Sequence, residues 1–209
     1  GTIIATYGDL IRVPGSSTSL QQVRARGGDV RVVYSALDAL EMAARNRDKT
    51  VVLAGIGFET TAPTVAATIL EAERRGVHNL RVLALLKLTA PVMRALLSSG
   101  ETRISGIICP GHVSVITGTE PYEFIPREFG VACAIAGFEP LDILEAVRSL
   151  SLQVKTSRPG VQNTYPRAVK REGNPVAIQT MYTVFEPCEA QWRGIGSIPQ
   201  SGLALRPEF

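Results

Sequence analysis

The sequence contains few of the residues that build metal or redox centres, with 3 cysteines and 2 histidines among 209 residues. The cysteines stand far apart, at positions 109, 133 and 188, and form no CxxC pair. A scattered, odd number of cysteines argues against a disulfide framework and against a metal knuckle. We therefore expect a protein of a reducing, cytoplasmic compartment.

Long hydrophobic runs and strong charge are also lacking. The longest apolar runs are about six residues, which is too short to span a bilayer. Lysine and arginine total 22 against 19 acidic residues, and the net charge of +3 argues against binding to nucleic acid or a membrane surface. No initiator methionine or signal-peptide core is visible at Gly1, so we expect the middle of a longer protein.

Short runs rich in valine and isoleucine alternate with segments of helical period from residue 2 to about residue 154. This alternation is typical of α/β proteins, and nearly continuous hydrophobicity predicts strands that are buried on both faces and paired in parallel. The expected strands are 2–6, 30–34, 50–56, 81–86, 106–109 and 131–136. The expected helices are 19–25, 36–47, 62–75, 90–98, 140–150, 161–171 and 175–185.

The pattern predicts two Rossmann-like α/β lobes, with parallel sheets flanked by helices, that face a cleft. Three expected strands precede Gly57 and three follow it, so each set suits one compact lobe. We expect residues 1–56 to form part of the first lobe and residues 57–152 to form the second. Residues 153–209 are expected to be mostly helical and irregular, and to return over the first lobe.

Unusual loops follow four of the expected strands, where parallel sheets commonly bind ligands. In the loop 7–15, Asp9 and Arg12 suit a polar substrate, or alternatively form a local ion pair that shapes the turn. In the loop 57–63, Glu59 suits a general base and Thr60 and Thr61 suit an anion site. The same three residues are also compatible with simple capping of the following helix.

His112 lies in the loop after the expected strand 106–109, three positions after Cys109. A Cys-x-x-His pair supplies only two of the three or four ligands of a metal site, so proton transfer or hydrogen bonding suits this histidine better. We expect Asp9, Arg12, Glu59, Thr60 and His112 to converge on one cleft, with Thr61 beside them. As loop residues, Asp9 and Glu59 are expected to tolerate alanine with little loss of stability.

Five stretches together carry a family resemblance. They are TYGDLIRVPG (6–15), GFETTAP (57–63), CPGHVSVITG (109–118), AGFEPLDIL (136–144) and WRGIGSIPQSG (192–202). In this order they resemble the HypD family of hydrogenase maturation proteins over essentially the whole chain.

The resemblance implies a scaffold, assisting proton or electron transfer rather than acting as a classical enzyme, on which the Fe(CN)2CO centre of NiFe hydrogenase is assembled. Its implied partners are a HypC-type chaperone and a HypE-type cyanide donor. Iron, carbon monoxide and a 4Fe-4S cluster are implied for the full-length family member, whose cysteine motifs lie outside this sequence. We therefore expect no metal or cofactor in this chain. The alternative is a small-molecule or anion-binding transferase with a two-domain cleft.

Overall fold

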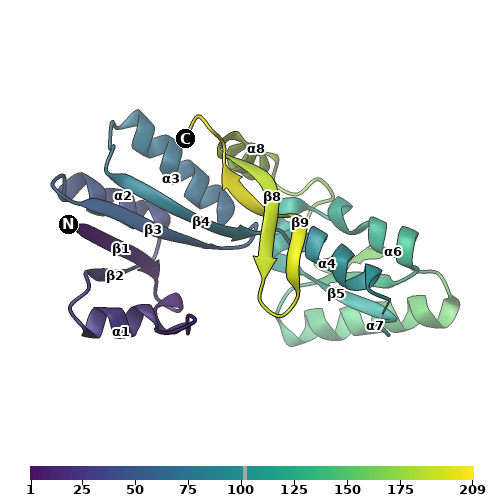
Figure 1. The fold of residues 1–209 in the computed structure, drawn as a ribbon. Helices are drawn as coiled ribbons and strands as arrows, with labels where there is room; N and C mark the ends of the chain where they lie inside the picture. Colours follow the sequence, from purple (N-terminus) through teal and green to yellow (C-terminus); the bar gives the residue numbers. More distant parts are fainter. Residues whose placement is uncertain (101–102) are drawn as a thin grey trace.

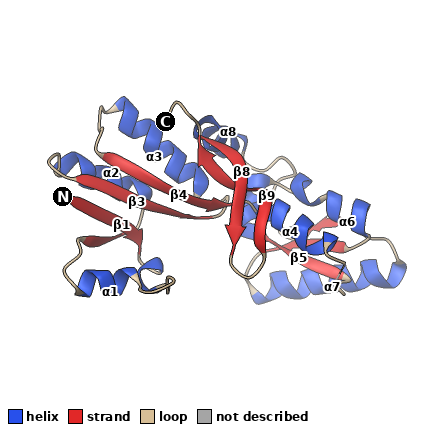
Figure 2. Cartoon of the chain, viewed as in Figure 1, coloured by secondary structure: helices blue, strands red, loops and turns tan. Residues whose placement is uncertain are grey.

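The computed structural model describes residues 1–100 and 103–209, and it confirms the α/β class. A mixed six-stranded sheet and a parallel three-stranded sheet are flanked by helices (Figures 1 and 2). In the part of the chain that is described, none of the helices combines the length and hydrophobicity needed to cross a bilayer.

The six-stranded sheet has the order β2-β1-β3-β4-β9-β8. Neighbouring strands from β2 to β4 are parallel, whereas β9 is antiparallel to both β4 and β8. Buried side chains of β1, β3, α2 and α3 form the larger core, which includes Ile3, Leu40 and Leu53. The elements of this sheet and its helices are β1 (Thr2–Tyr7), η1 (Leu10–Arg12), α1 (Leu20–Ala25), β2 (Val30–Val33), α2 (Ala36–Arg45), β3 (Thr50–Gly57), α3 (Ala62–Arg74), β4 (Leu80–Lys87), α8 (Pro175–Val184), β8 (Phe185–Trp192) and β9 (Gly196–Leu205).

The three-stranded sheet has the order β5-β6-β7 and is parallel throughout. Its main core contains Tyr122, Ile125 and Ile135, which are fully buried on the face opposite α7. Figure 1 shows this second lobe and the first lobe on either side of the β8–β9 hairpin. Its elements are α4 (Thr89–Ser98), β5 (Gly106–Pro110), α5 (Gly111–Thr117), η2 (Glu120–Tyr122), α6 (Phe124–Phe129), β6 (Ala132–Ala136), α7 (Pro140–Thr156) and β7 (Val161–Asn163).

The strand pairing differs from the sequence prediction in one respect. The strand expected at 81–86, which we assigned to the second lobe, is β4, and it pairs with β3 along the first sheet. Its side chains alternate between buried and exposed, because one face of β4 lies open near Leu83 and Leu85. Periodicity within a strand reports its burial and does not identify the strand with which it pairs.

The C-terminal region also differs, since it is not mostly helical. The helix expected at 161–171 is instead the short strand β7 followed by turns, and only the helix expected at 175–185 forms, as α8. The glycine-rich segment after Trp192 is the turn of the β8–β9 hairpin, in which Gly194 and Gly196 adopt positive φ angles of 81° and 101°. Glycine allows these angles without steric cost, so the segment that suggests an irregular loop closes a hairpin.

Helix starts follow the sequence signals closely in some places and not in others. Ser35 caps α2 in a capping box with Asp38, and Ser19 caps α1 in a capping box with Gln22. Thr61, for which capping of α3 was the alternative to an anion site, makes no side-chain hydrogen bond as a cap. Thr89 is the first residue of α4 rather than its N-cap, and the N-cap position makes no side-chain hydrogen bond. The acceptor for the first N–H of α4 therefore comes from a residue farther away in the sequence.

Candidate functional site

The carboxyl end of β3 is joined to the start of α4 by Glu59. Its Oε1 accepts a hydrogen bond from the Thr89 backbone N–H at 2.7 Å, and its Oε2 accepts one from the Thr89 hydroxyl at 2.9 Å. Glu59 is only 4% exposed. A carboxylate at a helix N-terminus satisfies an unpaired N–H and interacts favourably with the helix dipole. Glu59 therefore caps α4, 30 residues along the chain.

Burial dominates the electrostatics of Glu59. Loss of hydration raises the pKa of its carboxyl group above the ordinary value of 4.5, and the hydrogen bonds from Thr89 oppose that rise. The charge of Glu59 also contributes, after burial, to the raised pKa values of Tyr182 in α8 and Tyr122 in η2. Glu59 is thus close to elements of both lobes.

A second contact group lies at the same edge of the first sheet. The rings of Phe58 and Trp192 have centroids 6.2 Å apart, and the Lys87 ammonium lies 5.7 Å from the Trp192 ring centroid. Lys87 also donates a hydrogen bond to the Gln191 carbonyl at 3.0 Å, while the Trp192 indole N–H donates one to Ser201 Oγ at 2.8 Å. The contacts of Phe58 and Lys87 attach the β8–β9 hairpin to the ends of β3 and β4, and the Trp192–Ser201 hydrogen bond joins the two strands of the hairpin.

The carboxyl edge of the second sheet carries its own group of aromatic and charged side chains. His112 at the start of α5 packs against Phe138 after β6, with ring centroids 4.6 Å apart and ring planes tilted by 51°. Arg167 makes two hydrogen bonds to the buried Asp142, at 2.6 and 2.7 Å, and lies over the Tyr165 ring at 4.5 Å. The Arg167 hydrogen bonds hold the pKa of Asp142 below its ordinary value.

Two glycines permit the close packing at this edge. A β-carbon at Gly137 would overlap the Asp142 carboxylate, and one at Gly111 would overlap the Ala136 carbonyl oxygen. Any larger residue at either position would displace the loops that carry His112 and Phe138. The glycines of these two loops therefore have a steric role in positioning the aromatic pair.

The six residues expected from the sequence differ in exposure and in contacts. Asp9 and Arg12 lie exposed in the loop after β1, and no ion pair joins them within residues 1–100 and 103–209. Thr60 is exposed, whereas Thr61 packs beneath Gly57. No hydrogen bond, ion pair or ring contact among the described residues links Glu59 to His112. Their convergence on one cleft stays a prediction.

The residues present do not fit a resident iron–sulfur cluster. Cys109 and Cys133 are buried on the adjacent strands β5 and β6, whereas Cys188 lies on β8 of the other sheet. Among the described residues, no three histidine, cysteine or acidic side chains group as metal ligands. Because a 4Fe-4S cluster needs four cysteine thiolates, we assign no step to such a cluster.

The candidate residues include one side chain that is engaged in structural hydrogen bonds and several that are exposed to solvent. Both carboxylate oxygens of Glu59 are engaged by Thr89, so Glu59 is poorly placed as a general base. The exposed side chains of Asp9, Arg12, Thr60 and His112 remain accessible. Sequence reasoning missed Phe138 and Arg167, although the repeated Gly-Phe-Glu tripeptide at 57–59 and 137–139 is a signal for Phe138.

Together, the two sheets define an α/β protein whose candidate loops follow the carboxyl ends of parallel strands, where such folds commonly bind ligands. A family model described as "HypD: Hydrogenase formation hypA family" matches residues 1–209. The chain belongs to this family, which confirms the resemblance seen in the five sequence motifs.

Named relatives are similar over nearly the whole chain. Hydrogenase maturation factor HypD of Rhodobacter capsulatus is 43% identical over 99% of this chain and 55% of its own length. The HypD protein of Cupriavidus necator is 45% identical over 99% of this chain and 57% of its own length. The HypD protein of Escherichia coli K12 is 42% identical over 99% and 56%. The chain thus spans a little over half the length of the curated relatives it matches.

Proposed function

We propose that this chain acts in hydrogenase maturation, as the central α/β portion of a scaffold on which the Fe(CN)2CO centre of NiFe hydrogenase is assembled. The observation that supports this proposal is the family match over residues 1–209. Iron is the cargo of the scaffold in this proposal rather than a resident cofactor of residues 1–209. A HypC-type chaperone brings the iron, a HypE-type protein donates cyanide, and the work is done in the cytoplasm.

The exposed loop residues have the chemistry that such a scaffold needs. Asp9, Arg12 and Thr60 lie in the segments that follow strands of the first sheet, and His112 lies in the first turn of α5, which follows β5 in the second. A guanidinium group can hold an anionic ligand, and a neutral or protonated imidazole can accept or donate a proton near neutral pH. In this proposal these groups position the chaperone-bound iron, while Glu59 has a structural role as the cap of α4.

A chimera tests the proposed function directly. The matching span of the E. coli relative, aligned over 210 residues, is replaced by this chain in a strain that lacks its own copy. We expect the chimera to restore hydrogen-dependent dye reduction by the hydrogenases of that strain. A chimera that is soluble and folded but leaves hydrogenase immature would contradict the proposal and favour the transferase alternative.

Point variants of the chimera test the loop residues. Asp9→Ala and His112→Ala are expected to lower hydrogenase maturation while the chimera keeps its amount and its circular dichroism spectrum. Arg24→Ala, an exposed change on α1, is the matched control and is expected to keep full maturation. Equal maturation in all three variants would remove the functional role of the two loops.

A further inference from the structure

Two glycines pack against each other where the chain returns from the second lobe to the first. Gly118 follows α5 in the second lobe, and Gly173 lies in the segment 171–174, which we call the return segment because it leads into α8. A β-carbon on Gly118 would overlap the Arg171 carbonyl oxygen, and one on Gly173 would overlap the Ile116 carbonyl oxygen. Each glycine therefore leaves the space that the facing backbone occupies. We call this contact the Gly118–Gly173 crossing.

The backbone angles of both glycines also disfavour any other residue. Gly118 has a φ of 79° and a ψ of −164°, a region that is populated almost exclusively by glycine. Gly173 has a φ of 68°. A side chain at either position would be strained by its own backbone and would collide with the facing segment. The close approach of the two segments therefore requires glycine at both positions.

Backbone hydrogen bonds hold the return segment against the second lobe on both sides of the crossing. The Thr119 N–H donates to the Arg171 carbonyl at 3.0 Å, and the Asn174 N–H donates to the Ile116 carbonyl at 2.9 Å. The Arg171 side chain also forms an exposed ion pair with Glu120 at 3.0 Å. The return segment is thus attached to the end of α5 and to the start of η2.

Asn174 connects this attachment to the first lobe without an intervening linker. Its backbone N–H is bonded to the second lobe, and its side chain caps α8 by accepting a hydrogen bond from the Ala177 N–H at 3.1 Å. α8 packs along α3, and its residues Met181 and Val184 belong to the larger core. A shift of the return segment is therefore passed directly to a helix that is buried in the first lobe.

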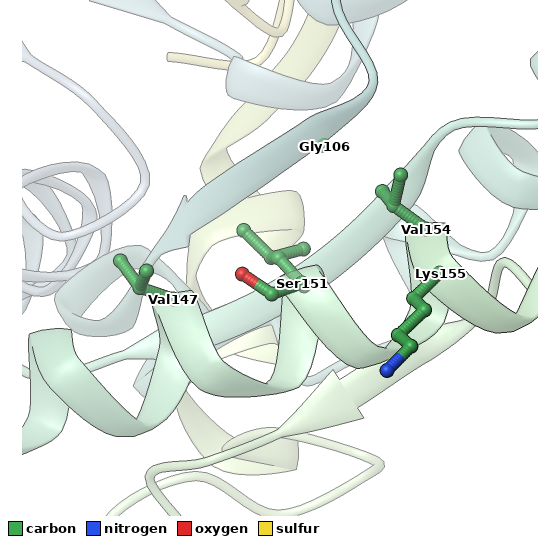
Figure 3. A pocket seen from close by; sticks show the side chains of 6 residues that line it. Gly106, Val147, Ser151, Val154 and Lys155 are labelled. Atoms are coloured by element: carbon green, nitrogen blue, oxygen red, sulfur yellow. The ribbon is translucent and has the colours of Figure 1, made fainter.

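The second lobe is packed as one body beyond the crossing. Its helix α7 lies against β5, where a β-carbon on Gly106 would contact the Leu150 side chain at 3.2 Å. Figure 3 shows α7 running alongside the strand that carries Gly106, with Val147 and Val154 on the flank beside a shallow cavity. α5 follows β5 directly and buries Val113, so α5 moves together with this packed unit.

A candidate site residue lies on each side of the crossing. His112 is in the first turn of α5, whose last residue is followed directly by Gly118. On the other side, α8 packs on α3, which begins two residues after Thr60. The distance between the two exposed side chains therefore depends on how α5 and α8 are joined.

We propose that the Gly118–Gly173 crossing is the joint that sets the orientation of the second lobe relative to the first, and that it thereby positions His112 relative to Thr60. Both glycines act through the helices that they join. The orientation can be measured on the 209-residue chain and does not depend on the proposed function, whereas the consequence for maturation rests on it.

Backbone residual dipolar couplings measure the relative orientation of the two lobes in this 22.4 kDa chain. In the wild type, one alignment tensor should fit both lobes, as expected for a joint without slack. In Gly118→Ala, the facing segments must separate by roughly 1 Å to bring the overlapping atoms to ordinary contact. Between neighbouring helices whose axes lie about 8 to 10 Å apart, this shift corresponds to a tilt of about 6°. Each lobe should still fit its own couplings, which shows that both remain folded.

The matched control is Gly130→Ala. Gly130 follows α6 in the same lobe with a φ of 66°, and a β-carbon there would meet no atom within 4 Å. This variant shares the positive φ but not the crossing, so the lobes should keep the wild-type orientation. Gly173→Ala approaches the crossing from the return segment and should tilt the lobes as Gly118→Ala does.

Two results on the chain would overturn the joint. One is a wild-type protein whose lobes need different alignment tensors, or whose Thr119 and Asn174 amides exchange with solvent at the rate of an unfolded chain. The other is an unchanged lobe orientation in folded Gly118→Ala or Gly173→Ala protein. The wild-type measurements decide the first result even where a variant fails to fold.

The chimera described above tests the consequence for maturation. Gly118→Ala should lower its hydrogen-dependent dye reduction about tenfold or more, because a misplacement of roughly 1 Å can cost about a hundredfold in rate. Gly130→Ala should keep full activity. An inactive wild-type chimera would contradict the proposed function and leave the measured lobe orientation unaffected. An active chimera whose Gly118→Ala form is tilted but fully active would overturn the positioning of His112 by the joint.

Discussion

Replacing Glu59 by alanine should destabilise the protein although Glu59 lies in a loop. The change leaves the Thr89 N–H and hydroxyl without their acceptor in a site where the carboxylate is 4% exposed. A hydrogen bond to a charged group contributes about 1.5 to 3 kcal/mol, and an unsatisfied buried donor costs about 1 to 3 kcal/mol. Relief of the buried charge offsets part of this loss. We expect a net loss of about 2 to 3 kcal/mol, or a thermal midpoint lower by roughly 4 to 12 °C.

The matched control is Glu139→Ala, because Glu139 is the third residue of the same Gly-Phe-Glu tripeptide at the other sheet edge. Its side chain is 76% exposed, so the expected change is within about 0.5 kcal/mol. Urea unfolding measures both variants, and amide hydrogen exchange at Thr89 gives a local readout that Glu59→Ala should accelerate. If Glu59→Ala matched the control in stability and in Thr89 exchange, the capping role assigned to Glu59 would be wrong.

Three further predictions concern titration and reactivity. Because burial raises the folded-state pKa of Glu59, wild-type stability should fall as pH rises from 4.5 through that pKa, and Glu59→Gln should flatten this part of the urea-midpoint profile. Because Arg167 lowers the folded-state pKa of Asp142, the stability it contributes should be present above pH 3.8 and lost in stronger acid, and Asp142→Asn should lack that loss. In a thiol titration of the native protein, Cys188 alone should react quickly, and rapid reaction of Cys109 or Cys133 would contradict their burial.

Local signals were sufficient to predict many of the elements. The apolar runs at 2–6 and 50–56 form β1 and β3, and Ser35 caps α2 as its position before a helical period indicates. These features depend on residues close together in the sequence. The pairing of β4 with β9 joins residues over a hundred positions apart, such as Leu86 and Leu203, and no local pattern specifies such pairing.

The candidate site shows the same division between local and distant information. The sequence singled out Glu59 because an acid follows an apolar strand directly. It could not identify Thr89 as the hydrogen-bond partner, since that depends on β4 lying beside β3 in the sheet. The local ion pair offered as an alternative for Asp9 and Arg12 does not form between these two described residues. Both side chains are exposed, as a binding role requires, and the Asp9→Ala variant of the chimera tests that role.

The repeated Gly-Phe-Glu tripeptide shows how position in a sheet determines the role of a motif. Both copies end a parallel strand, yet Glu59 is buried and Glu139 is exposed. Beside β3, the chain leaves β4 directly into α4, whose first N–H groups need an acceptor, and Glu59 supplies it. Beside β6, the chain leaves β7 into a turn that carries Arg167, so Glu139 meets a cation 3.3 Å away at the surface. Since α4 follows β4 of the first sheet and precedes β5 of the second in the chain, the buried glutamate stabilises the start of a helix that lies between the two sheets in the sequence.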